Sequence, residues 1–436
     1  MRLLLENGAN IDLPNKDKMS PLSIASREGH FYAVELLLQN KANVYQRDNT
    51  GNTPALWAAF GGHKHCLQTL MYCGSSLNDW NDKGENLLFL SIARSNLDMT
   101  KMLIQEGADI EKSTTYGMRP LHVAVLRGEI LVTRLLLQNG AIVNSLKGED
   151  LPALHIAARN GNEEMTELLL SYHANINEKD KNGFTAIQTV TSVKNENIIS
   201  LLLGRSDISL ENINGENVLH IAARKGFKSL AGYLINTYLD INSRNKFGET
   251  ALFLASAYGH GDVVKLLNDN GAEVNFGDEN NMSPLYIASQ KGYKNIVLTL
   301  LRNEARFNMC RMDEVTPLMA ASANGHIETA KCLLDYKKNI TYINQQDCEG
   351  RTALWHAAAN GYVEVVKTLL DYHLIDINKP DRYLVRPIMI ASAHKHSKVV
   401  ISLLKHGTII KSVRVIHVAV NNTVDVFRVR NQIDEI

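Results

Sequence analysis

Cysteine, tryptophan and proline are scarce in this sequence, and neither sign of charge predominates. The 436 residues include 5 cysteines, 3 tryptophans and 9 prolines, and 46 Lys and Arg side chains balance 46 Asp and Glu. An odd, scattered set of cysteines argues against a disulfide framework, so we expect a reducing, cytoplasmic setting, with the nucleus as the alternative. The zero formal net charge provides no overall field that would attract nucleic acid or an anionic membrane.

Long apolar runs and catalytic motifs are missing as well. No segment approaches the roughly 18 apolar residues of a membrane-spanning helix, and the apolar start Leu3-Leu4-Leu5 is too short for a signal peptide. The sequence contains no phosphate-binding loop, nucleophile elbow, paired-cysteine zinc pattern or kinase motif set. It therefore predicts a protein without a membrane span that is not an enzyme and has no catalytic residues, cofactor or metal.

The sequence is built instead from one phrase that recurs about every 33 residues. The phrase reads Thr/Ser-Pro-Leu-x-x-Ala, followed four residues after the Ala by Gly and then by an apolar cluster ending in Leu-Leu. Such a period indicates a repeat array rather than one closed globular core. The first positions of successive copies are Ser20, Thr53, Asn86, Arg119, Pro152, Thr185, Asn217, Thr250, Ser283, Thr316, Thr352 and Arg386.

The copy that begins at Thr316 shows how one unit should fold. The Thr316 hydroxyl can cap a helix whose first turn holds Pro317, and Gly325 allows the chain to turn where this helix ends. A second helix should follow, because the apolar residues from Ile327 to Leu334 recur at helical spacing. One unit is too small to bury its own leucines, so neighbouring units must stack.

These residues and their period resemble the ankyrin-repeat family over nearly the whole chain. The resemblance implies an all-α solenoid of stacked helix-turn-helix units with projecting β-hairpin fingers, which are the turns that precede each Thr/Ser position. It also implies that the recurring histidines tie neighbouring repeats together by hydrogen bonds rather than act as catalytic bases. These histidines are His122, His155, His220 and His417.

The repeat pattern suggests three segments and two irregular places. Residues 1–14 read as a partial repeat of second helix and turn, 15–411 as twelve repeats, and 412–436 as a degenerate, incomplete terminal repeat. Because both ends look cut, we expect a fragment of a longer multi-repeat protein. The copy at Thr185 has β-branched residues in place of alanines and Lys194 in place of Gly, which predicts a soft spot or bend. Two or three extra residues should lengthen the connection after Leu334.

The resemblance places partner contacts on the concave face, near the ends of the first helices, and on the finger tips. The first set forms a basic stripe that we interpret as a groove for an acidic protein segment. The alternative is a solvated helix face, partly neutralised by Glu85, Glu216 and Glu249. The stripe comprises Arg94, Arg127, Arg159, Arg224, Lys225 and Lys291, and other residues at these positions are Arg27, Glu28, Phe60, Tyr258, Asn324, Asn360 and His394.

The finger tips carry apolar and aromatic residues that are typical anchors of protein interfaces. The alternative is that they pack against adjacent fingers. Trp57, which lies within a first helix, is assigned to the core. The tip residues are Met118, Leu151, Phe184, Met282 and Trp80, together with Met19, Val315 and Tyr116.

The nearest approach to a metal site is His63-Lys64-His65-Cys66, but residues two apart do not share a helix face, and the same holds for His394 and His396. We therefore predict a protein-interaction scaffold or adaptor. The resemblance also fits the ankyrin portion of a membrane-linked protein, a channel, a ubiquitin-ligase substrate receptor or a latrotoxin-like toxin. Nucleic-acid binding through the stripe is the alternative from another class, disfavoured by the zero net charge and by the lack of an aromatic stacking ladder.

Overall fold

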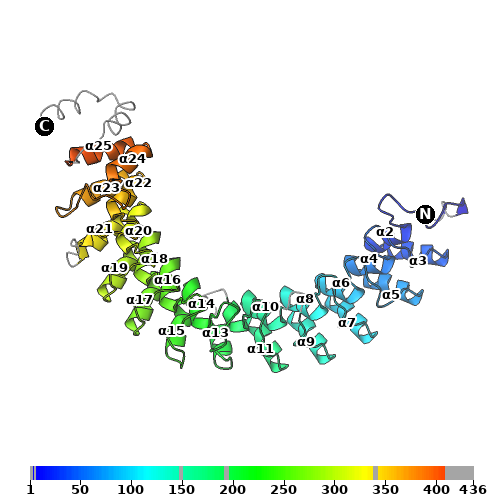
Figure 1. Cartoon of the computed structure of the whole chain (residues 1–436). Helices are drawn as coiled ribbons and strands as arrows, with labels where there is room; N and C mark the ends of the chain where they lie inside the picture. The colour runs from blue at the N-terminus through cyan, green and yellow to red at the C-terminus, as the bar shows by residue number, and fades with distance from the viewer. Residues whose placement is uncertain (1–2, 4–5, 147–150, 191–195, 337–341, 408–436) are drawn as a thin grey trace. The chain divides into compact units, whose positions relative to one another are not determined.

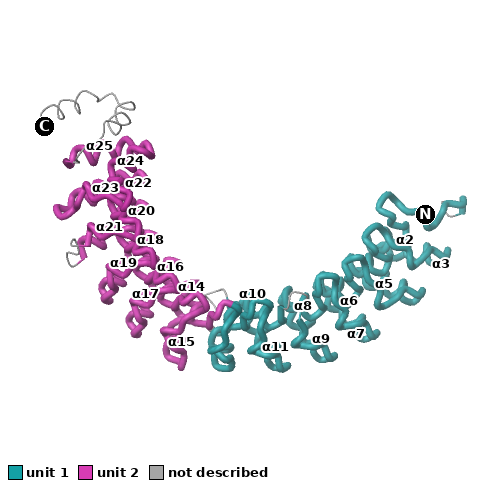
Figure 2. Tube along the Cα trace, in the orientation of Figure 1, with its two compact units in different colours: residues 1–213 teal, residues 214–436 magenta. Residues whose placement is uncertain are grey.

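The computed structural model of the chain describes residues 3, 6–146, 151–190, 196–336 and 342–407. The chain divides into two compact units, unit 1 with residues 1–213 and unit 2 with residues 214–436 (Figure 2). In both units the regular structure is a succession of short helices (Figure 1). Within the described residues, β-type pairing is confined to two isolated bridges, one between Trp80 and Asn86 and one between Leu146 and Pro152. The predicted all-α architecture is confirmed.

The helices come in pairs, each with an even-numbered first helix and an odd-numbered second helix. In unit 1 they are α2 (Pro21–Arg27), α3 (Phe31–Gln39), α4 (Pro54–Gly61), α5 (Lys64–Tyr72), α6 (Leu87–Ala93), α7 (Leu97–Gln105), α8 (Pro120–Arg127), α9 (Ile130–Gln138), α10 (Ala153–Asn160), α11 (Glu163–Ser171), α12 (Ala186–Thr189) and α13 (Glu196–Leu203). In unit 2 they are α14 (Val218–Lys225), α15 (Lys228–Ile235), α16 (Ala251–Tyr258), α17 (Gly261–Asp269), α18 (Pro284–Lys291), α19 (Lys294–Arg302), α20 (Pro317–Ala323), α21 (Ile327–Asp335), α22 (Ala353–Ala359), α23 (Val363–Leu370), α24 (Pro387–Ala393) and α25 (Ser397–Lys405).

The first helices begin where the recurring phrase predicts, because its hydroxyl residue caps the helix. Thr316 has an extended backbone, and its side chain accepts a hydrogen bond from the Met319 N–H at 3.3 Å, with Pro317 in the first turn. In α4, Gly62 ends the helix with a left-handed φ of 80°, a conformation that costs glycine little. The capping and turn chemistry of the sequence therefore sets the helix boundaries.

Within each unit, first helices pack on the next first helix, and second helices pack on the next second helix. Leu56 of α4 and Leu67 and Leu70 of α5 are completely buried in the core of unit 1. In unit 2, Leu354 of α22 and Leu369 of α23 are completely buried in the same way. Each such leucine stabilises the fold by about 1.5–3 kcal/mol. One core cluster thus runs from Leu22 to Ala141 in unit 1, and another from Met319 to Leu403 in unit 2.

The fingers are tight turns that are held to one another by backbone hydrogen bonds. The Asp48 carboxylate accepts hydrogen bonds from the backbone N–H groups of Thr50 and Asn52 and so closes its own turn. The next finger then docks on it, because the Asp82 N–H donates to the Thr50 carbonyl at 3.1 Å. This arrangement recurs along both units and fixes the register of each repeat on its neighbour.

The copy at Thr185 departs from the others, as its sequence predicts. Its first helix, α12, has only four residues and ends at Thr189, whereas the other first helices of the described chain have seven or eight. Lys194 lies outside the described residues, as do 337–341, where the inserted residues after Leu334 were expected, and the terminal segment 412–436. None of the described helices is long and apolar enough to cross a membrane.

We predict that the backbone amides of α12 exchange with solvent faster than those of α10. A four-residue helix forms few helical hydrogen bonds, and local opening is easier where such bonds are few. Hydrogen-exchange mass spectrometry on the intact chain would measure both segments in one sample. Equal protection of α10 and α12 would contradict the predicted soft spot.

Candidate functional site

Three residues of the predicted stripe lie in unit 1, at the ends of successive first helices. Arg94 caps α6, Arg127 is the last residue of α8, and Arg159 is the penultimate residue of α10. All three are exposed. Because α6, α8 and α10 pack side by side, the three basic residues form a row on unit 1.

The other three stripe residues lie in unit 2 and differ in their surroundings. Arg224 forms an ion pair with Glu216, a finger residue whose side chain is completely buried. Lys225 is exposed by its surface area. Its pKa is lowered, mainly because its amino group is partly desolvated and secondly by the charge of Arg224. Lys291 is exposed at the end of α18. The charge of Arg224 is therefore used within the fold, which leaves Lys225 and Lys291 as the accessible basic residues of this set.

Among the described contacts, the two other acidic finger residues are bound by asparagines of their own fingers. Glu85 accepts a hydrogen bond from Asn81 Nδ2 at 2.8 Å, and Glu249 accepts one from Asn245 Nδ2 at 2.7 Å. Both carboxylates thus help to close their own fingers. Of the three carboxylates expected to neutralise the stripe, only Glu216 has an ion pair with a stripe residue among the described contacts.

A hollow of about 440 Å³ lies in unit 1, where α2, α4 and α6 end. Its lining includes Arg27, Glu28, Phe60 and Arg94. The guanidinium carbon of Arg94 lies 3.8 Å from the centre of the Phe60 ring, a close cation–π stack. We call this hollow the Phe60 pocket. The sequence placed Phe60 and Arg94 on the same face but gave no sign that they stack.

The expectation for Trp57 is wrong, since the residue is partly exposed beside this pocket rather than in the core. Its indole Nε1–H donates to Asp48 Oδ2 at 2.7 Å, and its ring meets that of Phe60 edge-on at 5.4 Å. A polar partner outside the core keeps the ring at the surface, because the indole N–H needs an acceptor.

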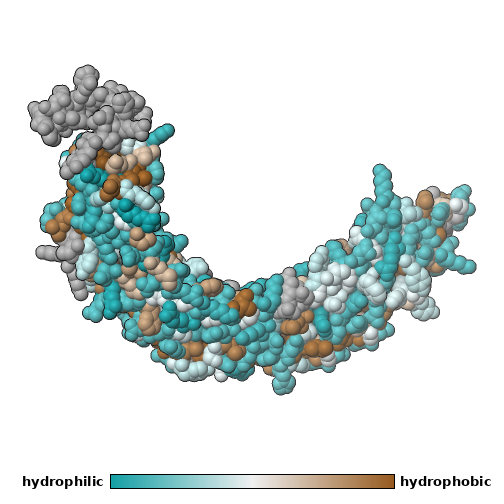
Figure 3. Space-filling model, viewed as in Figure 1, coloured by the Kyte–Doolittle hydropathy of each residue, from teal (hydrophilic) through white to brown (hydrophobic). Residues whose placement is uncertain are grey.

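The finger-tip residues are less uniform than predicted. Met19 is only 4% exposed, so its assignment to an exposed tip is wrong. The alternative, that the side chain packs against its neighbours, holds for this residue. Trp80 and Tyr116 are exposed, and Lys112 Nζ lies 4.2 Å from the centre of the Trp80 ring. The remaining tips are half-buried, and they are Met118, Leu151, Phe184, Met282 and Val315. In the view of Figure 3, hydrophilic residues cover most of the visible surface, with apolar residues scattered between them.

The recurring histidines join neighbouring repeats, as the resemblance implied. His122 Nε2 donates to the Ser145 carbonyl at 3.0 Å, His155 to that of Phe184 at 2.8 Å, and His220 to that of Ser243 at 3.0 Å. All three rings are buried. His417 lies outside the described residues. The three rings therefore act as structural ties.

A second set of histidine ties was not anticipated from the sequence. His63, His260 and His326 each precede a second helix and donate Nε2–H to a carbonyl near the end of the first helix of the preceding repeat, at 2.8 to 3.0 Å. His394 and His396 both hydrogen-bond to the Ala359 carbonyl. The regular position after the Gly was the signal that could have predicted this role. Among the described residues no group of three or more His, Cys, Asp or Glu side chains could hold a metal ion.

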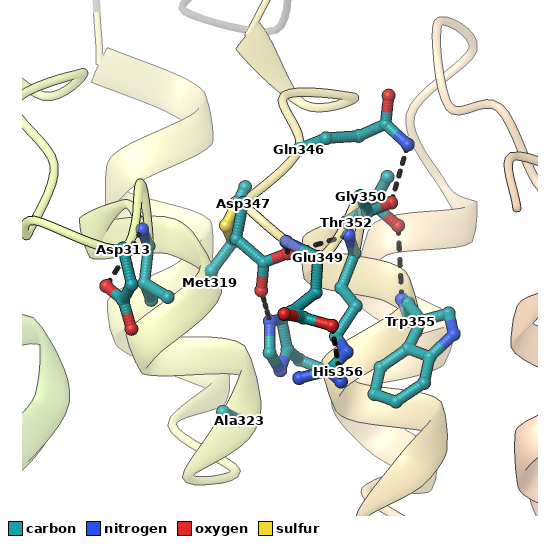
Figure 4. A network of polar contacts seen from close by, with 12 residues as sticks. Asp313, Met319, Ala323, Gln346, Asp347, Glu349, Gly350, Thr352, Trp355 and His356 are labelled. Atoms are coloured by element: carbon teal, nitrogen blue, oxygen red, sulfur yellow. Dashed lines mark hydrogen bonds and ion pairs between the residues drawn. The ribbon is translucent and has the colours of Figure 1, made fainter. Parts of the chain in front are cut away.

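Unit 2 holds one further polar network that the sequence did not indicate (Figure 4). The Asp347 carboxylate closes its finger by accepting the Glu349 and Arg351 N–H groups, and its other oxygen receives His356 Nε2–H at 2.9 Å. Burial lowers the pKa of His356, while Asp347 partly opposes this shift. His356 occupies the same position in its repeat as Trp57. Trp57 donates to Asp48 in the same way that His356 donates to Asp347. Both pairs tie a finger to the first helix that follows it.

We predict that the chain loses stability as the pH falls from about 6.5 towards 4. Burial lowers the pKa of His220 to about 4, so below its ordinary value of 6.5 the unfolded state binds the proton more readily than the folded state. The loss at His220 corresponds to about 3 kcal/mol once the pH falls below both values. Denaturant unfolding at pH 7.5 and pH 5 would measure the part of this loss that falls above pH 5, about 2 kcal/mol. His220→Asn should flatten the dependence of the free energy of unfolding on pH. The same change at exposed His30 serves as the control. Equal pH slopes for both variants would refute the assignment of the loss to His220.

Comparison with protein families gives one consistent result. A family model described as ankyrin repeats, three copies, matches residues 1–81, 56–147, 154–245, 219–313, 300–381 and 318–414. Together these matches cover most of the chain. The search of curated proteins gave no match. Ankyrin repeats generally mediate protein–protein interaction, and proteins built from them are typically non-enzymatic scaffolds.

Proposed function

Because the chain belongs to the ankyrin-repeat family, we propose that it is an interaction scaffold that binds an acidic segment of a partner protein along the ends of its first helices. The observation that carries this proposal is the row of exposed Arg94, Arg127 and Arg159 on unit 1. On unit 2, Lys225 and Lys291 are the accessible members of the set.

The spacing of the row suits an extended peptide. Packed helices lie about 8–10 Å apart, and an extended chain advances about 3.3 Å per residue. An acidic side chain at about every third residue would therefore meet one arginine after another. Exposed ion pairs contribute little individually, so affinity requires several of them together, along with some apolar contact.

We expect that changing Arg94, Arg127 and Lys291 to Glu removes the partners that the wild-type chain captures from a cell lysate. All three residues are exposed, so the change reverses surface charge without opening the core. Arg224 is left unchanged, since removing it would leave the buried Glu216 carboxylate without its counter-ion and destabilise the fold. Quantitative mass spectrometry of the captured proteins is the measurement.

The matched control changes Lys101, Arg134 and Lys265 to Glu. These residues are exposed on second helices, so the control has the same change in net charge at a different surface. The proposal requires proteins lost from the stripe variant, kept by the control, and containing an acidic segment that binds as a synthetic peptide. Equal captures by the wild type and the stripe variant would refute it and move attention to Trp80 and Tyr116 on the fingers. Loss of RNA or DNA instead of protein would support the nucleic-acid alternative.

A further inference from the structure

The Phe60 pocket of unit 1 differs from the rest of the basic row because an aromatic ring organises it. The Arg94 guanidinium lies over the Phe60 ring, with its central carbon 3.8 Å from the ring centre. A stacked guanidinium keeps its charge and holds its N–H donors in one plane at the ring edge. Less side-chain freedom is then lost when a ligand binds, so the arginine is prepared to receive a carboxylate.

The surroundings of Phe60 keep the stack in place. Trp57, fixed by its hydrogen bond to Asp48, buttresses the ring edge-on. Beneath the pocket, His63 donates to the Arg27 carbonyl at 3.0 Å, and Asn96 Nδ2 donates to the Gly62 carbonyl at 3.2 Å. These two bonds join three successive repeats at the floor of the pocket. The pocket is therefore supported by side chains and by backbone from α2, α4 and α6.

A second guanidinium lies on the other side of the pocket. Arg27 is 5.6 Å from the centre of the Trp57 ring, and its Nε donates to Glu28 Oε1 at 2.8 Å. Both side chains of this pair are more than 40% exposed. An exposed pair of this kind contributes little free energy, so a ligand carboxylate can replace Glu28 as the partner of Arg27. With two arginines and one glutamate, the charged lining of the pocket favours an anion.

We propose that the Phe60 pocket binds an Asp or Glu side chain of the partner segment between Arg94 and Arg27, with an adjacent aromatic or aliphatic side chain against the exposed part of Phe60. The inference rests on the proposed function, since it names the anchor within the same face. The hollow of about 440 Å³ has room for a few side chains rather than for a folded surface. The partner segment is accordingly an extended peptide in which an acidic residue adjoins an apolar one.

The test uses two fluorescein-labelled dodecapeptides and the full-length chain. One peptide carries Glu at every third position with a Phe beside the central Glu, and the other has Gln in place of every Glu. Fluorescence polarisation at low ionic strength measures both affinities. We expect the Glu peptide to bind more tightly, and Arg94→Lys and Phe60→Ala each to weaken it about tenfold, because each removes the stack and Arg94→Lys also removes the planar pair of donors. Glu28→Gln should tighten binding, because it frees Arg27.

The control is Arg134→Lys, on α9 and outside the pocket, which should leave the affinity unchanged. Phe60→Leu keeps an apolar side chain without an aromatic face, so it should behave as Phe60→Ala does while its thermal unfolding reports that the repeat still folds. If Arg94→Lys and Phe60→Ala bind as the wild type does while Arg94→Glu fails to bind, charge alone acts, and the pocket is refuted while the stripe stands. If the Glu peptide binds no better than the Gln peptide, the carboxylate assignment is refuted, whereas the stripe is judged separately by lysate capture.

Discussion

Every feature of this protein depends on the bond between one repeat and the next. In both units a finger N–H donates to the carbonyl of the finger before it, as Thr115 does to Lys83 and Glu279 to Phe247, at 2.8 and 3.0 Å. A single repeat has neither a closed core nor partners for these groups, so its stability comes largely from its neighbours. Because the bond fixes the register, equivalent positions of successive repeats stand side by side. The row of arginines on unit 1 is a consequence of that register.

Side chains reinforce the same register through three kinds of hydrogen bond between neighbouring repeats. Buried histidines such as His220 reach the finger of the next repeat, whereas His63 and its equivalents reach back to the first helix of the preceding repeat. Finger asparagines add a third tie, as when Asn242 Oδ1 accepts the Glu273 N–H at 2.8 Å. The histidine ties satisfy partly buried backbone carbonyls, and the asparagine tie satisfies an exposed backbone N–H. Burial, which lowers the pKa of His155 and of His220, also makes the array sensitive to acid.

Local chemistry explains which parts of the structure could be predicted from the sequence. Thr316, Pro317 and Gly325 act on their own backbone, so the sequence sufficed to place α20 and α21. Whether a side chain is exposed depends on its neighbours one repeat away, and there the sequence failed for Met19 and Trp57. The Phe60–Arg94 stack also joins two repeats, because Phe60 lies at the end of α4 and Arg94 at the end of α6. The sequence places both residues on one face, but whether they stack depends on the spacing of the two repeats, which the sequence alone does not give.

Arginine at the end of a first helix has a different role in each of the two units. Arg224 compensates a carboxylate that is completely buried, so its charge belongs to the stability of unit 2 and is not available to a partner. Arg94 rests on a neutral ring, which orients the guanidinium without cancelling its charge. A basic residue at the end of a first helix is therefore not in itself a binding residue. Its availability to a partner depends on its contact within the fold. A buried carboxylate such as Glu216 uses the charge, whereas an aromatic ring or an exposed carboxylate such as Glu28 leaves it available.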